Sequence, residues 1–92
     1  MSGSAAVEAP VLVAALRTPI GTAGRSLARL SAADLAAPVI AALCAELEQW
    51  GDADVRDVVL GNCTGPGGDL ARVAALQAGL PVTVPGLTVD RQ

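Results

Sequence analysis

The sequence lacks several of the side chains on which enzymes most often rely. Its 92 residues include no histidine, lysine, phenylalanine or tyrosine, and a single tryptophan, Trp50. These residues alone therefore cannot supply histidine acid–base chemistry, histidine metal ligation, a Schiff base or the lysine of a phosphate-binding loop. Most of the 52% hydrophobic fraction is alanine, valine and leucine, which predicts a thin core of small, closely packed side chains.

Other absences exclude classes of partner and location. The net charge is −3, and the six arginines are scattered, without a basic stripe or an aromatic platform. Nucleic acid is therefore not an expected partner. We find no apolar run long enough to cross a membrane, and residues 1–10 lack the basic start and apolar segment of a secretion signal. We interpret residues 1–10 as a flexible leader and predict a cytoplasmic protein with reduced cysteines.

The first half of the sequence has the pattern of a strand, a loop and a helix. Residues 11–16 are a continuous apolar run, typical of a strand covered on both faces in a parallel sheet. Residues 17–25 are rich in glycine and proline and predict a long loop, either functional or simply a mobile surface segment. A helix is expected from the capping pattern at 31–34 up to Gly51, with a buried stripe formed by Leu35, Val39, Leu43 and Leu47. Pro38 lacks the backbone donor, so the helix either begins near Asp34 or kinks there.

The second half repeats the alternation. Residues 57–61 predict a short strand, a glycine-rich loop follows over 62–68, and Asp69 is expected to cap a helix over 70–78. Leu87 and Val89 alternate in a final strand after a Pro-Gly turn. Right-handed crossovers then predict an α/β fold, βαβαβ, with a parallel sheet in strand order 3-2-1. Such a sheet has unpaired edges and should be completed by a further chain or segment.

Few residues are candidates for a chemical role. Cys44 lies beside the helical stripe and is interpreted as a small buried hydrophobe. Cys63, in the glycine-rich loop, is the better candidate for a reactive thiol, but no activating group is visible next to it. A glycine-rich loop before a helix can bind phosphate, yet the sequence has neither G-x-G-x-x-G nor a P-loop lysine, and Asp69 would repel an anion. We therefore assign no catalytic, cofactor-binding or metal-binding residue.

Four segments, in this order and spacing, resemble the N-terminal portion of a thiolase. They are Ala-Leu-Arg-Thr-Pro-Ile-Gly at 15–21, Val-Val-Leu-Gly-Asn at 58–62, Ala-Arg-Val-Ala-Ala-Leu-Gln-Ala-Gly-Leu-Pro at 71–81, and Val-Pro-Gly-Leu-Thr-Val-Asp-Arg-Gln at 84–92. The resemblance covers residues 11–92. Pro38 and the loop at 65–69 depart from the family's usual pattern, which leaves the substrate class and the loop geometry open.

The resemblance implies where the chemistry lies. In thiolases the last of these segments runs directly into a Cys-Gly-Ser-Gly motif, whose cysteine is acylated by an acyl-CoA and lies at the start of a buried helix. A second cysteine acts as general acid–base, and His and Asn residues build the oxyanion sites. None of these residues matches a position in 1–92. Within this chain, Asn62 and Arg72 are candidates for structural roles, and the loop at 17–25 for a pocket wall.

The resemblance therefore implies an acyltransferase that carries out Claisen condensation or thiolysis of acyl-CoA thioesters, with no cofactor besides its CoA substrates. We expect the chain to be its N-terminal subunit or fragment, inactive alone. A companion polypeptide or segment would begin with the nucleophilic cysteine after Gln92. The assembled enzyme is expected to be a homo-oligomer, because the family's corresponding last strand pairs antiparallel with its symmetry mate. The same edge could instead be covered by another element.

Two other functions remain open from the residues. One is a non-catalytic, thiolase-like module for interaction or dimerisation. The other is a small nucleotide-binding domain, which the missing phosphate motif disfavours.

Overall fold

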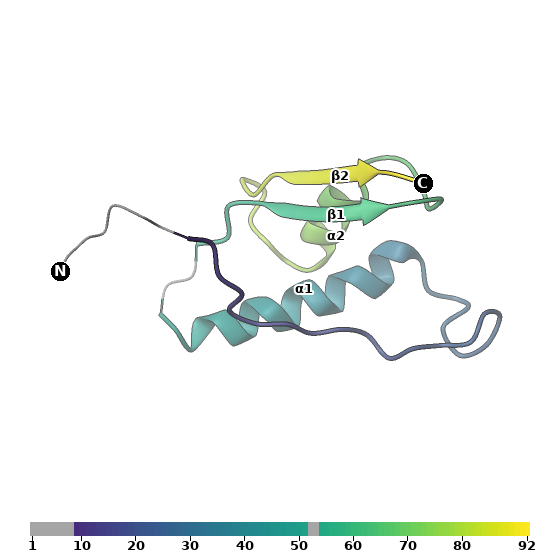
Figure 1. Ribbon diagram of the computed structural model, residues 1–92, viewed down its shortest axis with the longest axis horizontal. Coiled ribbons are helices and arrows are strands. Elements are labelled where there is room, and N and C mark those ends of the chain that lie inside the picture. The colour runs from purple at the N-terminus through teal and green to yellow at the C-terminus, as the bar shows by residue number, and fades with distance from the viewer. Residues whose placement is uncertain (1–8, 52–53) are drawn as a thin grey trace.

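The computed structural model describes residues 9–51 and 54–92, so the predicted leader at 1–10 lies almost wholly outside the described residues. Two helices and two strands alternate along the chain (Figure 1): α1 (Ala32–Glu48), β1 (Val58–Asn62), α2 (Leu70–Gln77) and β2 (Gly86–Asp90). The strands pair in parallel, with Val58 opposite Gly86 and Asn62 opposite Asp90. The small α/β unit and the parallel pairing of the last two predicted strands are thus confirmed.

The core lies between α2 and the two strands. Ala71 and Ala74 of α2 are fully buried, and Val58 and Val84 pack on the same side of this helix. Helix α1 packs on α2 rather than on the sheet. Small side chains fill these contacts, as the composition predicted, because alanine lets backbones approach closely. No helix among the described residues is long and apolar enough to cross a membrane.

Both helices have the predicted caps. The Ser31 hydroxyl accepts a hydrogen bond from the Asp34 amide at 3.1 Å, and the Asp34 carboxylate accepts one from the Ser31 amide at 3.0 Å. This capping box starts α1 at Ala32, so Pro38 lies inside one continuous helix, at an exposed position. Asp69 caps α2, and Gly79, at φ 93°, follows its end. A left-handed residue just after a helix is the usual helix stop.

Two expectations about the first half are not met within the described residues on their own. Residues 11–16 do not form a strand; they run alongside α1 (Figure 1) and expose most of their apolar side chains. A strand of this composition needs cover on both faces, and the described residues place no second layer on the sheet. The stripe of Leu35, Val39, Leu43 and Leu47 is only half-buried. Helix α1 buries Ala33 and Ala37 against α2 instead.

Gly86 marks the point where β2 comes closest to α2. A Cβ atom at this position would lie 2.5 Å from the Arg72 backbone nitrogen and 2.9 Å from the Ala71 carbonyl carbon. We expect Gly86→Ala to destabilise the chain by about 1–3 kcal/mol, because two backbones must move apart. Gly61→Ala, in the neighbouring strand, is the control, since its Cβ would meet nothing within 4 Å. Urea unfolding followed by circular dichroism tests this, and equal midpoints for the two variants would contradict it.

Asp34 links the start of α1 to α2. The Ser31 backbone N–H, then the Gln77 amide (2.8 Å to the carboxylate) and the Ser31 hydroxyl, hold the pKa of this carboxyl below its ordinary value of 3.8. The unfolded chain therefore binds this proton more readily than the folded chain. The stabilisation is complete above that ordinary value and is lost as the pH falls through the lower folded pKa.

We therefore expect Asp34→Asn to lower the urea midpoint at pH 7 and to lower it less at an acid pH below 3.8, as the wild-type carboxyl takes up its proton. Midpoints of both proteins at the two pH values provide the measurement. A difference that does not change with pH would show that the charge of Asp34 is unimportant for stability.

Candidate functional site

The carboxyl ends of both strands meet at one edge of the sheet. This carboxyl edge consists of Asn62, the loop at 63–69 and the segment 90–92, which ends beside that loop (Figure 1). In open parallel sheets, ligand and catalytic sites lie outside the carboxyl ends of the strands. The carboxyl edge is therefore the first place to look for function.

Asn62 joins the parts of the carboxyl edge. Its side-chain nitrogen donates to the Asp90 carboxylate at 3.1 Å and to the Pro66 carbonyl at 3.0 Å, while its side-chain oxygen accepts from the Gly65 amide at 2.9 Å. Its backbone carbonyl accepts from the Arg91 amide at 2.9 Å. The predicted structural role of Asn62 is thus supported by four hydrogen bonds.

The start of α2 is tied to β2 by side chains. Thr88 donates to the Asp69 carboxylate at 2.7 Å and accepts from the Ala71 amide at 2.9 Å, and Asp69 accepts from the Arg72 amide at 3.3 Å. Asp69 adopts a left-handed conformation, φ 55°, which aspartate tolerates because its side chain bonds locally. The amides of Ala71 and Arg72, which a phosphate would need, are already occupied, and the carboxylate repels anions. The structure therefore gives no support to the nucleotide-binding alternative.

The other candidates from the sequence are dispersed. Arg72 donates to the Val84 carbonyl at 2.7 Å and so fixes the turn before β2 to α2. Cys63 is a free, exposed thiol at the carboxyl edge, and its carbonyl accepts from the Gln92 side chain at 3.4 Å. Cys44 is a free, half-buried thiol on α1, which fits its predicted role as a small hydrophobe. The two cysteines belong to different regions of the fold and form no pair.

Sequence reasoning missed Thr88 and Asp90. Both residues make hydrogen bonds to segments that are distant in the sequence: Thr88 bonds the start of α2, and Asp90 bonds Asn62. Their only local signal is their alternation with Leu87 and Val89 in a strand. The register that places Asp90 opposite Asn62 becomes visible only in the folded chain.

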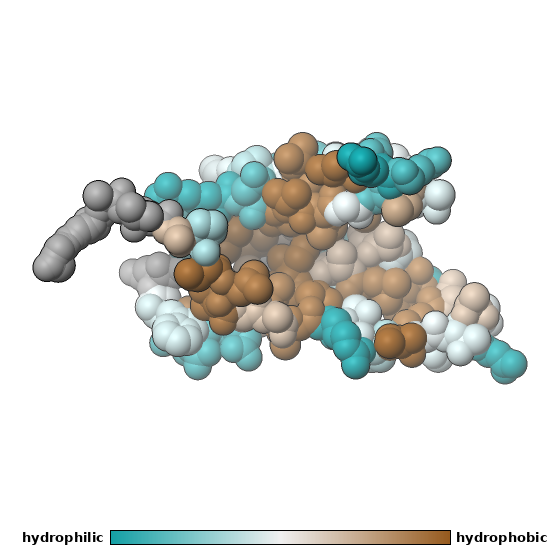
Figure 2. All heavy atoms as spheres, in the orientation of Figure 1, coloured by the Kyte–Doolittle hydropathy of each residue, from teal (hydrophilic) through white to brown (hydrophobic). Residues whose placement is uncertain are grey.

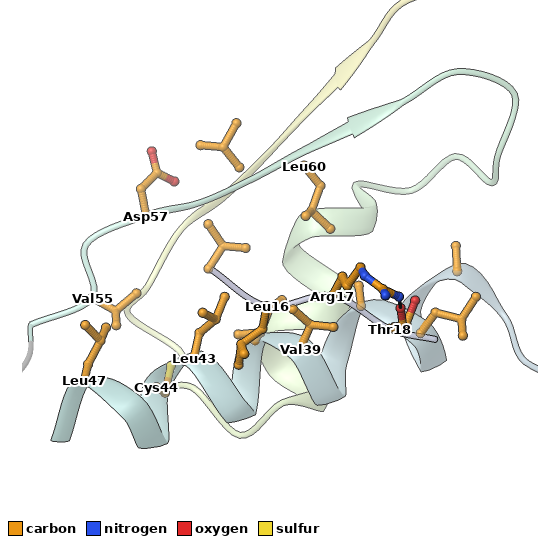
Figure 3. Close-up of a pocket in the computed structure, with 16 residues that line it drawn as sticks. Leu16, Arg17, Thr18, Val39, Leu43, Cys44, Leu47, Val55, Asp57 and Leu60 are labelled. Carbon is orange, nitrogen blue, oxygen red and sulfur yellow. Dashed lines mark hydrogen bonds between the residues drawn. The ribbon is translucent and has the colours of Figure 1, made fainter. Parts of the chain in front are cut away.

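A second feature is an apolar groove of about 620 Å³ between α1, β1 and the segment 16–18. Figure 2 shows apolar side chains gathered in the hollow between the sheet and α1, and Figure 3 shows Leu43 and Leu47 of α1 on the side facing β1. The half-buried stripe of α1, Cys44 and Leu60 all line it. Arg17, at one end, donates to the carbonyl of its neighbour Thr18 at 3.0 Å. An apolar surface this open in a small unit is typical of one that packs against further protein.

The carboxyl edge has positioning groups but no catalytic set. Its carboxylates and amide are bonded to one another or to the backbone. Within the described residues, no group of three or more acidic or cysteine side chains lies close enough to hold a metal ion. The geometry fixes where the chain leaves β2; it provides no acid–base pair.

Comparison with known proteins identifies the family. Residues 10–92 match the family described as "Thiolase, N-terminal domain". A Bacillus subtilis (strain 168) protein, provisionally named acetyl-CoA C-acetyltransferase YhfS, is 51% identical over 82 residues, or 89% of this chain. Proteins with the provisional name acetyl-CoA C-acetyltransferase VraB are 42% identical in Staphylococcus aureus (strain COL) and 43% identical in Staphylococcus haemolyticus (strain JCSC1435), each over 89% of this chain.

These relatives are much longer than the region they share with this chain. The chain spans 21% of the length of each. The match nevertheless includes α1, β1, α2 and β2, so it covers every helix and strand of the described structure. The chain belongs to the thiolase family, and what it carries is the N-terminal part of the thiolase fold.

Proposed function

We propose that this chain is the N-terminal portion of a thiolase that condenses or cleaves acyl-CoA thioesters, and that the nucleophilic cysteine is provided by residues beyond 1–92. The observation that carries the proposal is the family match over residues 10–92. The names of three relatives, all acetyl-CoA C-acetyltransferases, support the same chemistry. Acyl-CoA and CoA are then substrates, and the chemistry needs no further cofactor.

The proposed reaction proceeds by acyl transfer to sulfur. A cysteine thiolate attacks the carbonyl carbon of an acyl-CoA, the C–S bond to CoA breaks, and CoA leaves as a thiol after taking up a proton. In condensation, a second acyl-CoA loses an α-proton and its carbon attacks the acyl-enzyme, which releases the cysteine. In thiolysis the same steps run in reverse. Residues 1–92 contribute scaffold to this reaction, through the carboxyl edge on which the chain leaves β2.

The proposal extends to how the sheet is completed. Residues 11–16 would join the free edge of β1, giving strand order 3-2-1. Leu12 is 96% exposed as it stands, so burial in a covered sheet would remove a large apolar side chain from water. The rest of the thiolase fold would cover the apolar groove. The loop at 17–25, whose Arg17 and Thr18 line the groove, would then form part of a wall.

We also propose that the assembled enzyme is a homo-oligomer that uses the outer edge of β2. Leu87 and Val89 of this strand point to the face of the sheet opposite α2 and are 53% and 47% exposed. In the described residues this edge has no strand partner. An unpaired edge with exposed apolar residues is a template for pairing with another strand, and an antiparallel match with a second copy has the required two-fold symmetry.

The test is to purify the assembled enzyme through a tag on this chain and incubate it with acetyl-CoA. Peptide mass spectrometry then locates the acetylated cysteine. We expect acetylation at a cysteine outside 1–92, with Cys44 and Cys63 unmodified. The Cys44→Ser/Cys63→Ser double variant should keep acyl transfer within about twofold of the wild type.

Three other outcomes contradict the proposal. Acetylation of Cys63 or Cys44 would place the nucleophile in this chain. Turnover of a thioester by the isolated chain would show that no further residues are needed. Stable association with a partner but no acyl-enzyme would favour the non-catalytic interaction module.

A further inference from the structure

We propose that Asn62 is a positioning residue for the nucleophile: it fixes the direction in which the chain leaves β2. The inference rests on the proposed function, in which the acylated cysteine directly follows the segment 90–92. Asn62 itself touches neither substrate nor reacting atom. It acts through Asp90, Arg91 and the glycine-rich loop.

The side chain of Asn62 uses its hydrogen-bonding groups in three directions. Its nitrogen has two hydrogens, one for Asp90 and one for Pro66, and its oxygen accepts from Gly65. This arrangement also fixes the orientation of the amide. Rotating it by 180° would turn its oxygen toward the Asp90 carboxylate and its N–H groups toward the Gly65 N–H. Asn62 therefore holds one orientation.

The exit segment is held at successive points along its length. Asp90 is bound by the Asn62 side chain at 3.1 Å, the Arg91 amide by the Asn62 carbonyl at 2.9 Å, and the Gln92 side chain by the Cys63 carbonyl at 3.4 Å. The bond from Arg91 extends the strand pairing one residue beyond β2. Asn62 provides two of these three links, one from its side chain and one from its backbone.

The same amide sets the shape of the loop. Gly65 lies so close that a Cβ atom there would be 2.5 Å from the Asn62 side-chain oxygen. The loop thus turns tightly around Asn62 while Asn62 holds Asp90. A shift of the loop would therefore disturb the bond from Asn62 to Asp90, which couples the direction of the chain after β2 to the loop.

The positioning by Asn62 should affect the rate of the chemical step. A nucleophile must approach the thioester carbonyl within a narrow range of distance and angle, and misplacement by about 1 Å can cost roughly 100-fold in rate. Binding of CoA depends on contacts made elsewhere. Loss of the Asn62 side chain should therefore lower kcat and leave KM nearly unchanged.

The experiment compares four variants of the assembled enzyme in steady-state kinetics and in the rate of single-turnover acylation by acetyl-CoA. Asn62→Ala removes all three side-chain bonds. Asn62→Asp keeps the shape but faces the Asp90 carboxylate with a second one. Asn62→Asp/Asp90→Asn exchanges the two groups, so that an amide again faces a carboxylate. Thr64→Ala is the control: this exposed side chain in the same loop makes no hydrogen bond among the described residues.

We expect kcat and the acylation rate to fall roughly 10- to 100-fold in Asn62→Ala and in Asn62→Asp, with KM within about twofold. The exchanged pair should be several-fold faster than Asn62→Asp, because it restores the contact between positions 62 and 90, although both variants lose the bond to the Pro66 carbonyl. Thr64→Ala should retain the wild-type rate in full. A role limited to stability would leave kcat unchanged at temperatures where every variant is folded, which circular dichroism verifies.

The possible failures are distinguishable. If the wild-type assembly forms no acyl-enzyme, the proposed function fails and this inference with it. If the wild type is active and Asn62→Ala keeps its kcat within twofold, only the positioning role is overturned. The same holds if the exchanged pair is no faster than Asn62→Asp, because the contact with Asp90 would then not carry the effect.

Discussion

The close contact between α2 and β2 is the constraint on which the rest of the structure depends. Gly86 leaves room for the backbone of α2, and buried Ala71 and Ala75 keep the helix thin on the side that meets the strands. Thr88 then reaches the first turn of α2, and Arg72 reaches back to the Val84 carbonyl. Small side chains bury little area each. Hydrogen bonds from side chains to the backbone therefore provide part of the stabilisation that a larger core would provide.

This contact aligns the two strands and brings their carboxyl ends together. The helix between them makes the pairing parallel, as a crossover connection does, and the register puts Asn62 opposite Asp90. The carboxyl edge is therefore a direct product of the helix packing. Under the proposed function, this portion of a thiolase would influence catalysis by setting where the chain goes after β2. The apolar groove between α1 and β1 is open, and in the proposed enzyme the rest of the thiolase fold would pack against it.

Features encoded by neighbouring residues could be predicted from the sequence, and features that need two distant segments could not. The capping box at Ser31 and Asp34, the cap at Asp69 and the stop at Gly79 are local, and each was confirmed. The links from Thr88 to Ala71 and from Asn62 to Asp90 span 17 and 28 residues and depend on strand register. The strand predicted at residues 11–16 is not formed for a related reason. A continuous apolar run favours a strand that is covered on both faces, and the described residues provide no second layer over the sheet. The stripe of α1 is half-buried because the alanines of α1 made the closer contact with α2.

The parallel alignment that brings Cys63 and Gln92 to one edge can be measured by paramagnetic relaxation in solution. With Cys44→Ala in place, a nitroxide spin label on exposed Cys63 is the only label on the chain. We expect strong broadening of the backbone amide signals of Arg91 and Gln92. The signal of Gly86, about 16 Å away at the other end of a five-residue strand, and that of Val84, which precedes the strand, should broaden much less. Stronger broadening at Val84 and Gly86 than at Gln92 would mean that the strands do not pair in this register, and would contradict the account.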